Sequence, residues 1–374
     1  MKITNIELFQ ISIPFVRPYK LSKVYGTLTH ADAVIVKVYT DTGIVGWGEA
    51  DPKAPFTTDT PESVITTIRD RMAPHLVGAD PTRIGLIEFK LDQVVEDNLT
   101  ARGAVNMALY DILGKVYQAP AHTFLGGLVH EKLPLLGPIG SGTPQEDTEA
   151  IENLIREGYR TVMIKMGAQS VEQDIERMIS AFEKFGDRVT FIADANQGWE
   201  LDEALTFAQG IRDFEPIMVE QPVGRHEIEG LKELCNRMTC LVSADESLVS
   251  FRDADLLMRS GAADTFSIKV SKNGGLTKSK IIANAAEVSG IKCLMNSMLE
   301  FGITQAASLQ LGCTLNNLTD CGHAYMSVLR MSDDITNFGN YISRAVVTVP
   351  DTPGLGVAVD EGKLETYTEH RLKI

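Results

Sequence analysis

The sequence has few of the features that mark nucleic-acid-binding, membrane or disulfide-rich proteins. Its 374 residues carry 35 basic and 50 acidic side chains, a formal net charge of −15. Such a charge repels phosphate backbones and anionic lipid headgroups, so we expect no nucleic acid and no membrane among the partners. The five cysteines form no CxxC pair, which argues against a disulfide framework and favours a reducing compartment.

Long hydrophobic runs are also missing. Thr4, Asn5 and Glu7 interrupt the stretch in which a signal peptide would need apolar residues. No window approaches the roughly 20 apolar residues of a membrane-spanning helix. Glycine and proline are scattered along the chain, so no low-complexity linker is visible. We therefore expect a folded, soluble protein of the cytoplasm.

The first part of the chain predicts strands followed by helices. Apolar and polar residues alternate over 3–13 and 33–39, which is typical of half-buried strands. Helical patterns follow over 62–72 and 104–116. This order predicts an α+β domain over residues 1–128.

From residue 129 the pattern changes to a repeated unit of one short apolar run, a loop and an amphipathic helix. The runs end at positions spaced by 29, 26, 25, 24 and 27 residues, namely Lys165, Asp194, Glu220, Asp245, Lys269 and Asn296. Units of this size predict alternating strands and helices around a parallel sheet. A first strand at 133–139 and a last one at 317–320 make eight, which predicts a closed α/β barrel over residues 129–340. Residues 341–374 are expected to return to the N-terminal domain.

Three carboxylates end three consecutive runs of the predicted barrel. Asp194, Glu220 and Asp245 would converge at the mouth, where loops after the strands build active sites. Three oxygen ligands suit Mg²⁺ better than Zn²⁺, which prefers histidine and cysteine. The sequence therefore predicts a Mg²⁺ site, which Mn²⁺ could also occupy.

Two lysines flank these carboxylates, one strand before and one strand after. Lys165 and Lys269 would face a metal-bound carboxylate substrate from opposite sides. The metal would stabilise the enediolate that forms when the α-proton leaves. A neighbouring cation should lower the pKa of a lysine so that it can accept this proton. The pattern therefore predicts proton transfer by a lysine pair.

The chain resembles the enolase superfamily, in its muconate lactonizing enzyme-like subgroup. The similarity covers essentially the whole chain. It is carried in the barrel by 164–167 (IKMG), 194–199 (DANQGW), 220–222 (EQP), 244–247 (ADES), 268–269 (IK) with 274–275 (GG), and 298–300 (MLE), and outside the barrel by 43–49 (GIVGWGE), 108–111 (ALYD) and 353–356 (PGLG).

This resemblance implies a (β/α)7β modified TIM barrel with an N-terminal α+β capping domain. It implies Mg²⁺ on the three carboxylates, the two lysines as acid and base, and an enolate mechanism of the kind general to the superfamily. Loops at 19–29 and 52–56 would close the site over the substrate, and a homo-oligomer is expected. Further site residues are expected at Tyr19, Tyr25, Asn296, Glu300 and His323 as substrate contacts, and at Asn196 as support for the metal ligands.

Two departures from the family pattern narrow the reaction. Met163 replaces the first lysine of the usual Lys-x-Lys, which argues against muconate cycloisomerase, succinylbenzoate synthase and the usual dipeptide epimerases. The last predicted strand, 318–323, lacks the Asp-x-Asp with which dipeptide epimerases hold an ammonium group. Lys269 stands where mandelate racemase-type enzymes have Asp, so sugar-acid dehydration is also disfavoured.

The predicted function is Mg²⁺-dependent abstraction of the proton α to a carboxylate. Racemisation or epimerisation of a small amino-acid or proline-derived acid is the leading prediction. The same lysine pair would serve a dehydratase of a 3-hydroxy amino or imino acid such as 3-hydroxyproline, which remains an alternative. A barrel that binds a metal or ligand without turnover is the alternative from another class.

Overall fold

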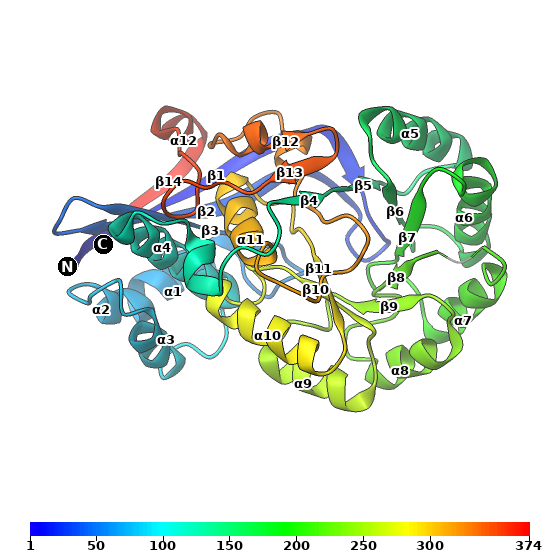
Figure 1. The fold of residues 1–374 in the computed structure, drawn as a ribbon, viewed down its shortest axis with the longest axis horizontal. Helices are drawn as coiled ribbons and strands as arrows, with labels where there is room; N and C mark the ends of the chain where they lie inside the picture. Colours follow the sequence, from blue (N-terminus) through cyan, green and yellow to red (C-terminus); the bar gives the residue numbers. More distant parts are fainter. Residues whose placement is uncertain (215) are drawn as a thin grey trace.

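The capping domain is built on an antiparallel sheet that joins both ends of the described chain. The structure is a computed structural model that describes residues 1–214 and 216–374. The sheet has the order β14-β1-β2-β3, so the C-terminal strand pairs with the N-terminal one (Figure 1). Its strands are β1 (Ile3–Lys20), β2 (Thr27–Thr40), β3 (Val45–Ala50) and β14 (Thr368–Lys373).

Helices cover one face of this sheet. The contact between β3 and α4 is close because Gly48 has no side chain, and a Cβ there would lie 1.8 Å from the carbonyl oxygen of Ala104. Asp111 of α4 accepts hydrogen bonds from the backbone of Trp47 and Leu355, each at 3.0 Å. The cap helices are α1 (Pro61–Thr67), which continues through a π-helical turn at Ile68–Met72, then α2 (Ala73–Leu76), α3 (Ile84–Asp92) and α4 (Leu99–Tyr117).

The barrel contains a seven-stranded parallel sheet in sequential order, with helices on its outer side (Figure 1). Its strands are buried along most of their length, as expected for strands that are covered on both faces. The strands are β5 (Leu136–Ile139), β6 (Thr161–Lys165), β7 (Thr190–Asp194), β8 (Met218–Glu220), β9 (Leu241–Ala244), β10 (Thr265–Ile268) and β11 (Lys292–Met295). The helices are α5 (Pro144–Glu157), α6 (Val171–Phe185), α7 (Leu201–Gly210), α8 (Ile228–Arg237), α9 (Phe251–Ser260), α10 (Leu276–Val288) and α11 (Gly302–Gly312).

The eighth strand position is filled by an irregular segment. Residues 317–323 connect the two edges of the parallel sheet through single bridges, Cys293 with Leu318 and Leu135 with His323. The backbone N–H of Cys293 donates to Asn317 at 2.7 Å, and that of Leu136 donates to His323 at 3.1 Å. The barrel closes as the sequence predicts, but without a regular last strand.

The predicted first barrel strand is divided in two. Residues 132–134 form β4 (Lys132–Pro134), which pairs antiparallel with β13 (Val346–Thr348), while β5 alone joins the barrel sheet. A three-stranded sheet of β12 (Ile342–Ser343), β13 and β4 therefore lies beside the barrel. The remaining elements are α12 (Glu361–Tyr367) and three 3₁₀ helices at Ala121–Leu125, Ser327–Arg330 and Phe338–Tyr341. None of the helices in the described part of the chain is long and apolar enough to cross a membrane.

Glu49, at the end of β3, attaches the cap to the barrel. Its carboxylate oxygens accept hydrogen bonds from the backbone of Phe301 at 2.6 Å and Thr304 at 2.9 Å, at the start of α11. Asp51 continues this junction, because it accepts a hydrogen bond from the Thr304 hydroxyl at 3.0 Å. Glu49 in β3 and Asp51 directly after it therefore also fix where the following loop meets the barrel mouth. The residue boundaries of the three predicted segments stay predictions.

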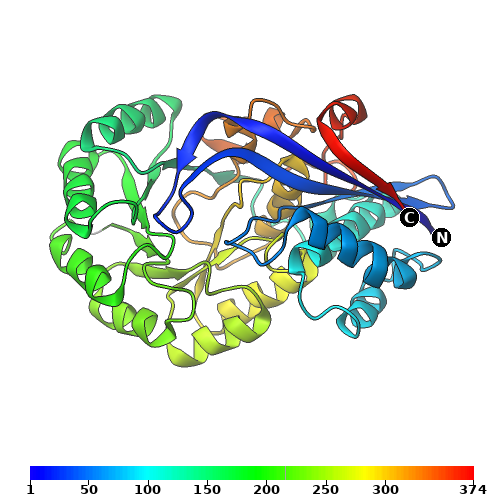
Figure 2. The ribbon, with the colours of Figure 1, turned by 180° about the vertical axis from the view of Figure 1, so that it is seen from behind.

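The turn between β1 and β2 reaches from the cap to the barrel mouth. Figure 2 shows these two strands (blue) extending across the barrel. The hydroxyl of Ser22 donates to the carbonyl of Asn196 at 2.9 Å, and the backbone N–H of Lys23 donates to Gly167 at 2.9 Å. The cap thus contributes residues to the same end of the barrel as the strand-end side chains.

Candidate active site

The side chains that end the barrel strands lie side by side. In the parallel pairing, Lys165 is opposite Asp194, and Asp194 is opposite Glu220. Asp245 and Lys269 directly follow β9 and β10. The structure therefore brings the five predicted residues to one end of the barrel, each from its own strand.

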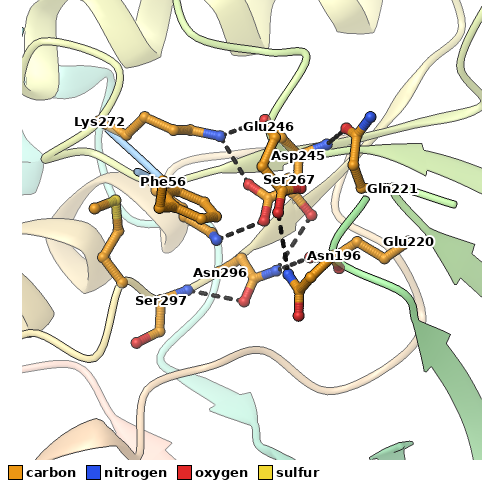
Figure 3. Close-up of polar contacts among 12 residues, drawn as sticks. Phe56, Asn196, Glu220, Gln221, Asp245, Glu246, Ser267, Lys272, Asn296 and Ser297 are labelled. Atoms are coloured by element: carbon orange, nitrogen blue, oxygen red, sulfur yellow. Dashed lines mark hydrogen bonds and ion pairs between the residues drawn. The ribbon is translucent and has the colours of Figure 1, made fainter. Parts of the chain in front are cut away.

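The lysines pair with two of the carboxylates. Lys165 contacts the Asp194 carboxylate. Lys269 lies 2.6 Å from one oxygen of Asp245, and Lys272 lies 2.7 Å from the other. Lys272 also donates to the backbone carbonyl of Asp245 at 2.5 Å (Figure 3). All five side chains are nearly inaccessible to solvent, so these contacts are strong charge-assisted hydrogen bonds.

Amide side chains hold the remaining carboxylates. Asn296 donates to Glu220 at 2.8 Å, and Asn196 donates to Glu246 at 3.2 Å (Figure 3). The backbone N–H of Asn196 donates to Asp194 at 3.0 Å, so Asn196 contacts one of the predicted metal ligands, and its support of a bound metal stays a prediction. The Glu220 carboxylate is buried and keeps its Oε2 without a hydrogen-bond partner among the described residues.

Carboxylate partners keep the two predicted catalytic lysines charged. Burial lowers the pKa of Lys165, but the Asp194 carboxylate outweighs this and the pKa lies above its usual value. Lys269 shows the same balance with Asp245, and its pKa is also raised. The protein groups alone therefore do not give these lysines the lowered pKa that a general base requires. Burial does lower the pKa of Lys272, despite the nearby Asp245.

The acids of the site have divergent pKa values. Burial and the charges of Asp194 and Asp245 raise the pKa of Glu220 well above its ordinary value. Burial, followed by the same two charges, raises the pKa of Glu246 to about 7. The pKa of Asp245 is lowered, because Lys269 and Lys272 outweigh the effect of its burial. The crowding of carboxylates marks a place where added positive charge would be strongly stabilised.

The donor set suits a hard divalent cation. Asp194, Glu220 and Asp245 supply buried carboxylate oxygens, and one oxygen of Glu220 is unpartnered. As they are placed, no three or more His, Cys, Asp or Glu side chains of residues 1–214 and 216–374 are grouped to hold a metal ion. The two aspartates instead face lysine ammonium groups. The residues fit a Mg²⁺ site in ligand type and position, provided that the aspartates turn away from the lysines.

A cavity of about 70 Å³ lies at the barrel mouth beside these residues. Both predicted lysines line it, as do Phe56 from the cap and Met163, the residue that replaces a family lysine. None of its described lining residues is acidic. The polar side chains of the lining are those of Tyr19, Tyr25, Lys53, Lys165, Asn196, Lys269, Asn296, Ser297, Ser327 and Arg330.

The structure separates the predicted substrate contacts into two groups. Tyr19, Tyr25 and Asn296 line the cavity. Glu300 is buried beside it, where its carboxylate accepts hydrogen bonds from Ser297 at 2.8 Å and from Gln305 at 2.5 Å. His323 lies in the segment that closes the barrel, and its Nδ1 accepts a hydrogen bond from the backbone of Met295 at 3.2 Å. Neither Glu300 nor His323 is among the described residues that line the cavity. Substrate contact by these two stays a prediction.

Three cations of the site were not predicted. Lys272 follows Lys269 by one turn, and its position directly before the Asn-Gly-Gly turn is the one sequence signal that could have found it. Lys53 belongs to the predicted loop 52–56 but was not singled out. The guanidinium of Arg330 lies 4.0 Å from the ring centre of Tyr19. Among the described residues, no carboxylate lies within ion-pair distance of Lys53 or Arg330.

Comparison with known proteins identifies the architecture and the family. The family model for the N-terminal domain of mandelate racemase and muconate lactonizing enzyme matches residues 5–126, and the enolase C-terminal domain-like model matches residues 146–363. An L-Ala-D/L-Glu epimerase of Bacillus subtilis (strain 168) is 31% identical over 359 residues, which cover 96% of this chain and 97% of that protein. A chloromuconate cycloisomerase of Pseudomonas putida is 29% identical over 98% of this chain and 99% of its own.

Solved structures give the same result. The crystal structure of the N-succinyl Arg/Lys racemase from Bacillus cereus ATCC 14579 matches with a TM-score of 0.96 at 28% identity and covers 100% of both chains. The match includes the cap, the barrel and the C-terminal segment, and the relatives are named as an epimerase, a racemase and a cycloisomerase. The chain therefore belongs to the mandelate racemase/muconate lactonizing enzyme family, as an enolase-superfamily enzyme of the muconate lactonizing enzyme-like subgroup.

Proposed function

We propose that this enzyme removes the α-proton of a small carboxylic acid and returns a proton to the opposite face. The predicted outcome is racemisation or epimerisation of a small amino-acid or proline-derived acid. The observation that carries this proposal is that Lys165 and Lys269 both line one cavity, although they come from opposite sides of the carboxylate group. Three strands, β7 to β9, separate the strands that end at these lysines.

The chain's own residues supply the acid, the base and the orientation. A neutral Lys165 accepts the proton from one face of the α-carbon, while the protonated Lys269 delivers one to the other face, and the roles reverse for the other enantiomer. In the structure Asp194 and Asp245 contact the two ammonium groups, and these contacts would open when the aspartates turn to hold Mg²⁺. Phe56 covers Lys269, and Tyr19 of β1 and Tyr25 of the β1–β2 turn line the same cavity, so the reacting carbon would be shielded from bulk water.

Members of the enolase superfamily depend on Mg²⁺, and Asp194, Glu220 and Asp245 would hold the ion here. When bound, the cation supplies charge stabilisation for the substrate carboxylate as the α-proton leaves and neutralises the aspartates that keep the lysines charged. The buried, unpartnered oxygen of Glu220 supports this assignment.

The charge of the cavity lining supports an anionic substrate. Met163, Met298 and Met326 contribute apolar side chains to its lining. Lys53 and Arg330 add positive charge to the lining, and neither forms an ion pair with a carboxylate of residues 1–214 or 216–374. The L-Ala-D/L-Glu epimerase and the N-succinyl Arg/Lys racemase are named for larger, extended substrates. Because Met163 replaces a family lysine and residues 318–323 lack the Asp-x-Asp, we favour a compact amino or imino acid over a dipeptide or an N-acylated long-chain amino acid.

Proton NMR in D₂O tests the reaction class. The wild-type enzyme with Mg²⁺ is incubated with both enantiomers of small amino acids, with proline and hydroxyproline isomers, and with N-acyl amino acids as larger comparisons. The α-proton signal of a substrate should fade. Lys165→Ala and Lys269→Ala should each slow exchange of one enantiomer by about 10²–10⁴-fold, while Lys232→Ala, on the outer helix α8, should not.

The product separates the alternatives. A new vinylic or keto product from a 3-hydroxy acid such as 3-hydroxyproline would select the dehydratase alternative with the same lysine pair. Exchange that survives in both lysine variants would refute the assignment of the bases. Metal binding without exchange of any compound would favour the non-catalytic alternative.

A further inference from the structure

Two barrel residues outside the predicted site, Gln197 and Arg225, connect the two cap loops that reach the barrel mouth. We refer to residues 21–26, between β1 and β2, as the first cap loop. Residues 51–60, between β3 and α1, are the second cap loop. These loops belong to one domain and the two connecting residues to the other.

Gln197 contacts the first cap loop through its side-chain amide. Its Nε2 donates to the hydroxyl of Tyr25 at 2.5 Å. Its Oε1 accepts from the backbone N–H of Arg225 at 2.8 Å and from Arg225 Nε at 3.4 Å. Gln197 has a φ of +63°, a left-handed conformation that a residue with a side chain rarely adopts. Such local strain persists where surrounding contacts hold it and is frequent at functional sites.

Arg225 extends the same connection to the second cap loop. Its Nη2 donates to the carbonyl oxygens of Pro55 at 3.2 Å and Phe56 at 3.0 Å. Its own carbonyl accepts from the hydroxyl of Ser247 at 2.8 Å, which fixes it to the barrel. Among the described residues, Arg225 is the one barrel residue that hydrogen-bonds residues 53–58.

Phe56 is the side chain that this connection places over the site. Its ring centre lies 4.3 Å from the ammonium of Lys269 and 5.7 Å from that of Lys272. The ring of Tyr25 contacts it at 5.5 Å between centres, so both cap loops meet at this point. No described cation–π contact joins Phe56 to Lys165. The Phe56 ring therefore covers Lys269 but not Lys165.

We propose that Gln197 and Arg225 form a latch that positions Phe56 over Lys269, and that they are positioning residues for the half of the reaction that Lys269 serves. This inference rests on the proposed function, because it assigns an effect to one lysine of the pair. A merely structural role would loosen the whole mouth and slow both enantiomers alike. The latch instead predicts that exchange slows for the enantiomer that depends on Lys269 and much less for the other.

The experiment measures α-proton exchange in D₂O for both enantiomers of the substrate that exchanges fastest. The enantiomer whose exchange is lost in Lys269→Ala is the one that Lys269 deprotonates. Arg225→Met and Gln197→Met should slow this enantiomer by about 10- to 100-fold, since a misplacement near 1 Å costs up to about 100-fold. The other enantiomer should slow less than about 3-fold. Arg225→Lys, which keeps one donor for the loop carbonyls, should recover part of the loss.

Two further variants keep the result specific. Phe56→Leu should reproduce the asymmetry, because it removes the aromatic cover and leaves both connecting residues in place. Arg237→Met, on the outer side of α8 with an ion pair to Glu233, is the matched control and should leave both rates unchanged. Equal slowing of both enantiomers in the Arg225 and Gln197 variants would overturn the latch.

Hydrogen–deuterium exchange of the backbone gives a readout that does not depend on turnover. In Arg225→Met, amides of residues 52–58 should lose protection, while those of the barrel strands should not. Unchanged protection of residues 52–58 would overturn the latch even if activity fell. If the wild-type enzyme exchanged no α-proton, the proposed function would fail, and this measurement would still decide whether Arg225 holds the loop.

Discussion

His323 offers a sharp test of whether a residue near the barrel mouth contacts substrate or supports the fold. Its side chain is 1% exposed, and its Nδ1 accepts a hydrogen bond from the backbone of Met295. Burial, with a smaller contribution from His130, lowers the pKa of His323 to about 3. The imidazole is therefore neutral in the folded protein at every pH at which the enzyme would be assayed.

The magnitude follows from the difference between the folded and unfolded states. An unfolded histidine has a pKa of about 6.5, so below this pH unfolding takes up a proton that the folded state does not bind. Stability therefore falls as the pH drops from 6.5 towards 3, by about 1.4 kcal/mol between pH 7.5 and 5.5. With an unfolding entropy of about 2.1 cal/mol/K per residue, 374 residues give a loss of about 2 °C in Tm.

The assay compares the Tm of the wild-type enzyme and His323→Asn at pH 7.5 and 5.5, at constant Mg²⁺. The asparagine oxygen can accept the same backbone hydrogen bond but does not titrate. Contributions from other groups cancel, so the wild type should lose about 2 °C more than the variant over this interval. Because His323 does not line the cavity, kcat/KM at pH 8 should change less than about 3-fold. Equal Tm losses, or a large loss of kcat/KM with an unchanged Tm, would refute this reasoning.

Three further outcomes are expected. Glu49→Ala leaves two backbone donors of α11 without acceptors and should destabilise the protein by about 2–3 kcal/mol in thermal unfolding, whereas the exposed Asp70→Ala should not. Glu220→Gln should weaken Mg²⁺ binding at least about 10-fold by calorimetry, with Glu183→Gln as the control, and α-proton exchange should stop in EDTA and return with Mg²⁺. Burial lowers the pKa of Lys53 to about 8 despite nearby Asp51, so Lys53 loses its charge as pH rises. The KM for an anionic substrate should therefore increase above pH 8 in the wild type, but should be high and flat in Lys53→Met.

The barrel could be predicted because its strands obey a strong physical constraint. Each strand is a short apolar run buried on both faces, and the run ends recur about every 25 residues. The irregular form of the closing segment 317–323 could not be predicted in this way. It makes only one bridge to each neighbouring edge and needs no regular strand pattern. The predicted first strand, 133–139, is too long. Residues 132–134 pair with β13, which lies more than 200 residues later, and no local pattern indicates this partner.

The site was predictable where a residue's role follows from its position at a strand end, and less so where its partner is remote. The carboxylates and lysines come directly after apolar runs. Gln197 and Arg225 lie in loops, and their partners Tyr25 and Phe56 are about 170 residues away in sequence. The predicted lowering of the lysine pKa depends on a bound cation and stays a prediction. The protein groups alone raise the pKa of Lys165, because it contacts Asp194, a pairing that no sequence pattern shows.

The pairing of β14 with β1 affects the order in which the enzyme can assemble during translation. The barrel strands emerge from the ribosome before residues 368–373, so the barrel can fold while one edge of β1 still lacks its neighbour. An open strand edge is a template for pairing with other chains. Nascent chains are therefore exposed to misassembly at this edge of the cap until the last strand pairs with β1. Slow translation of the last strand would prolong this vulnerable interval without changing a single contact of the finished enzyme.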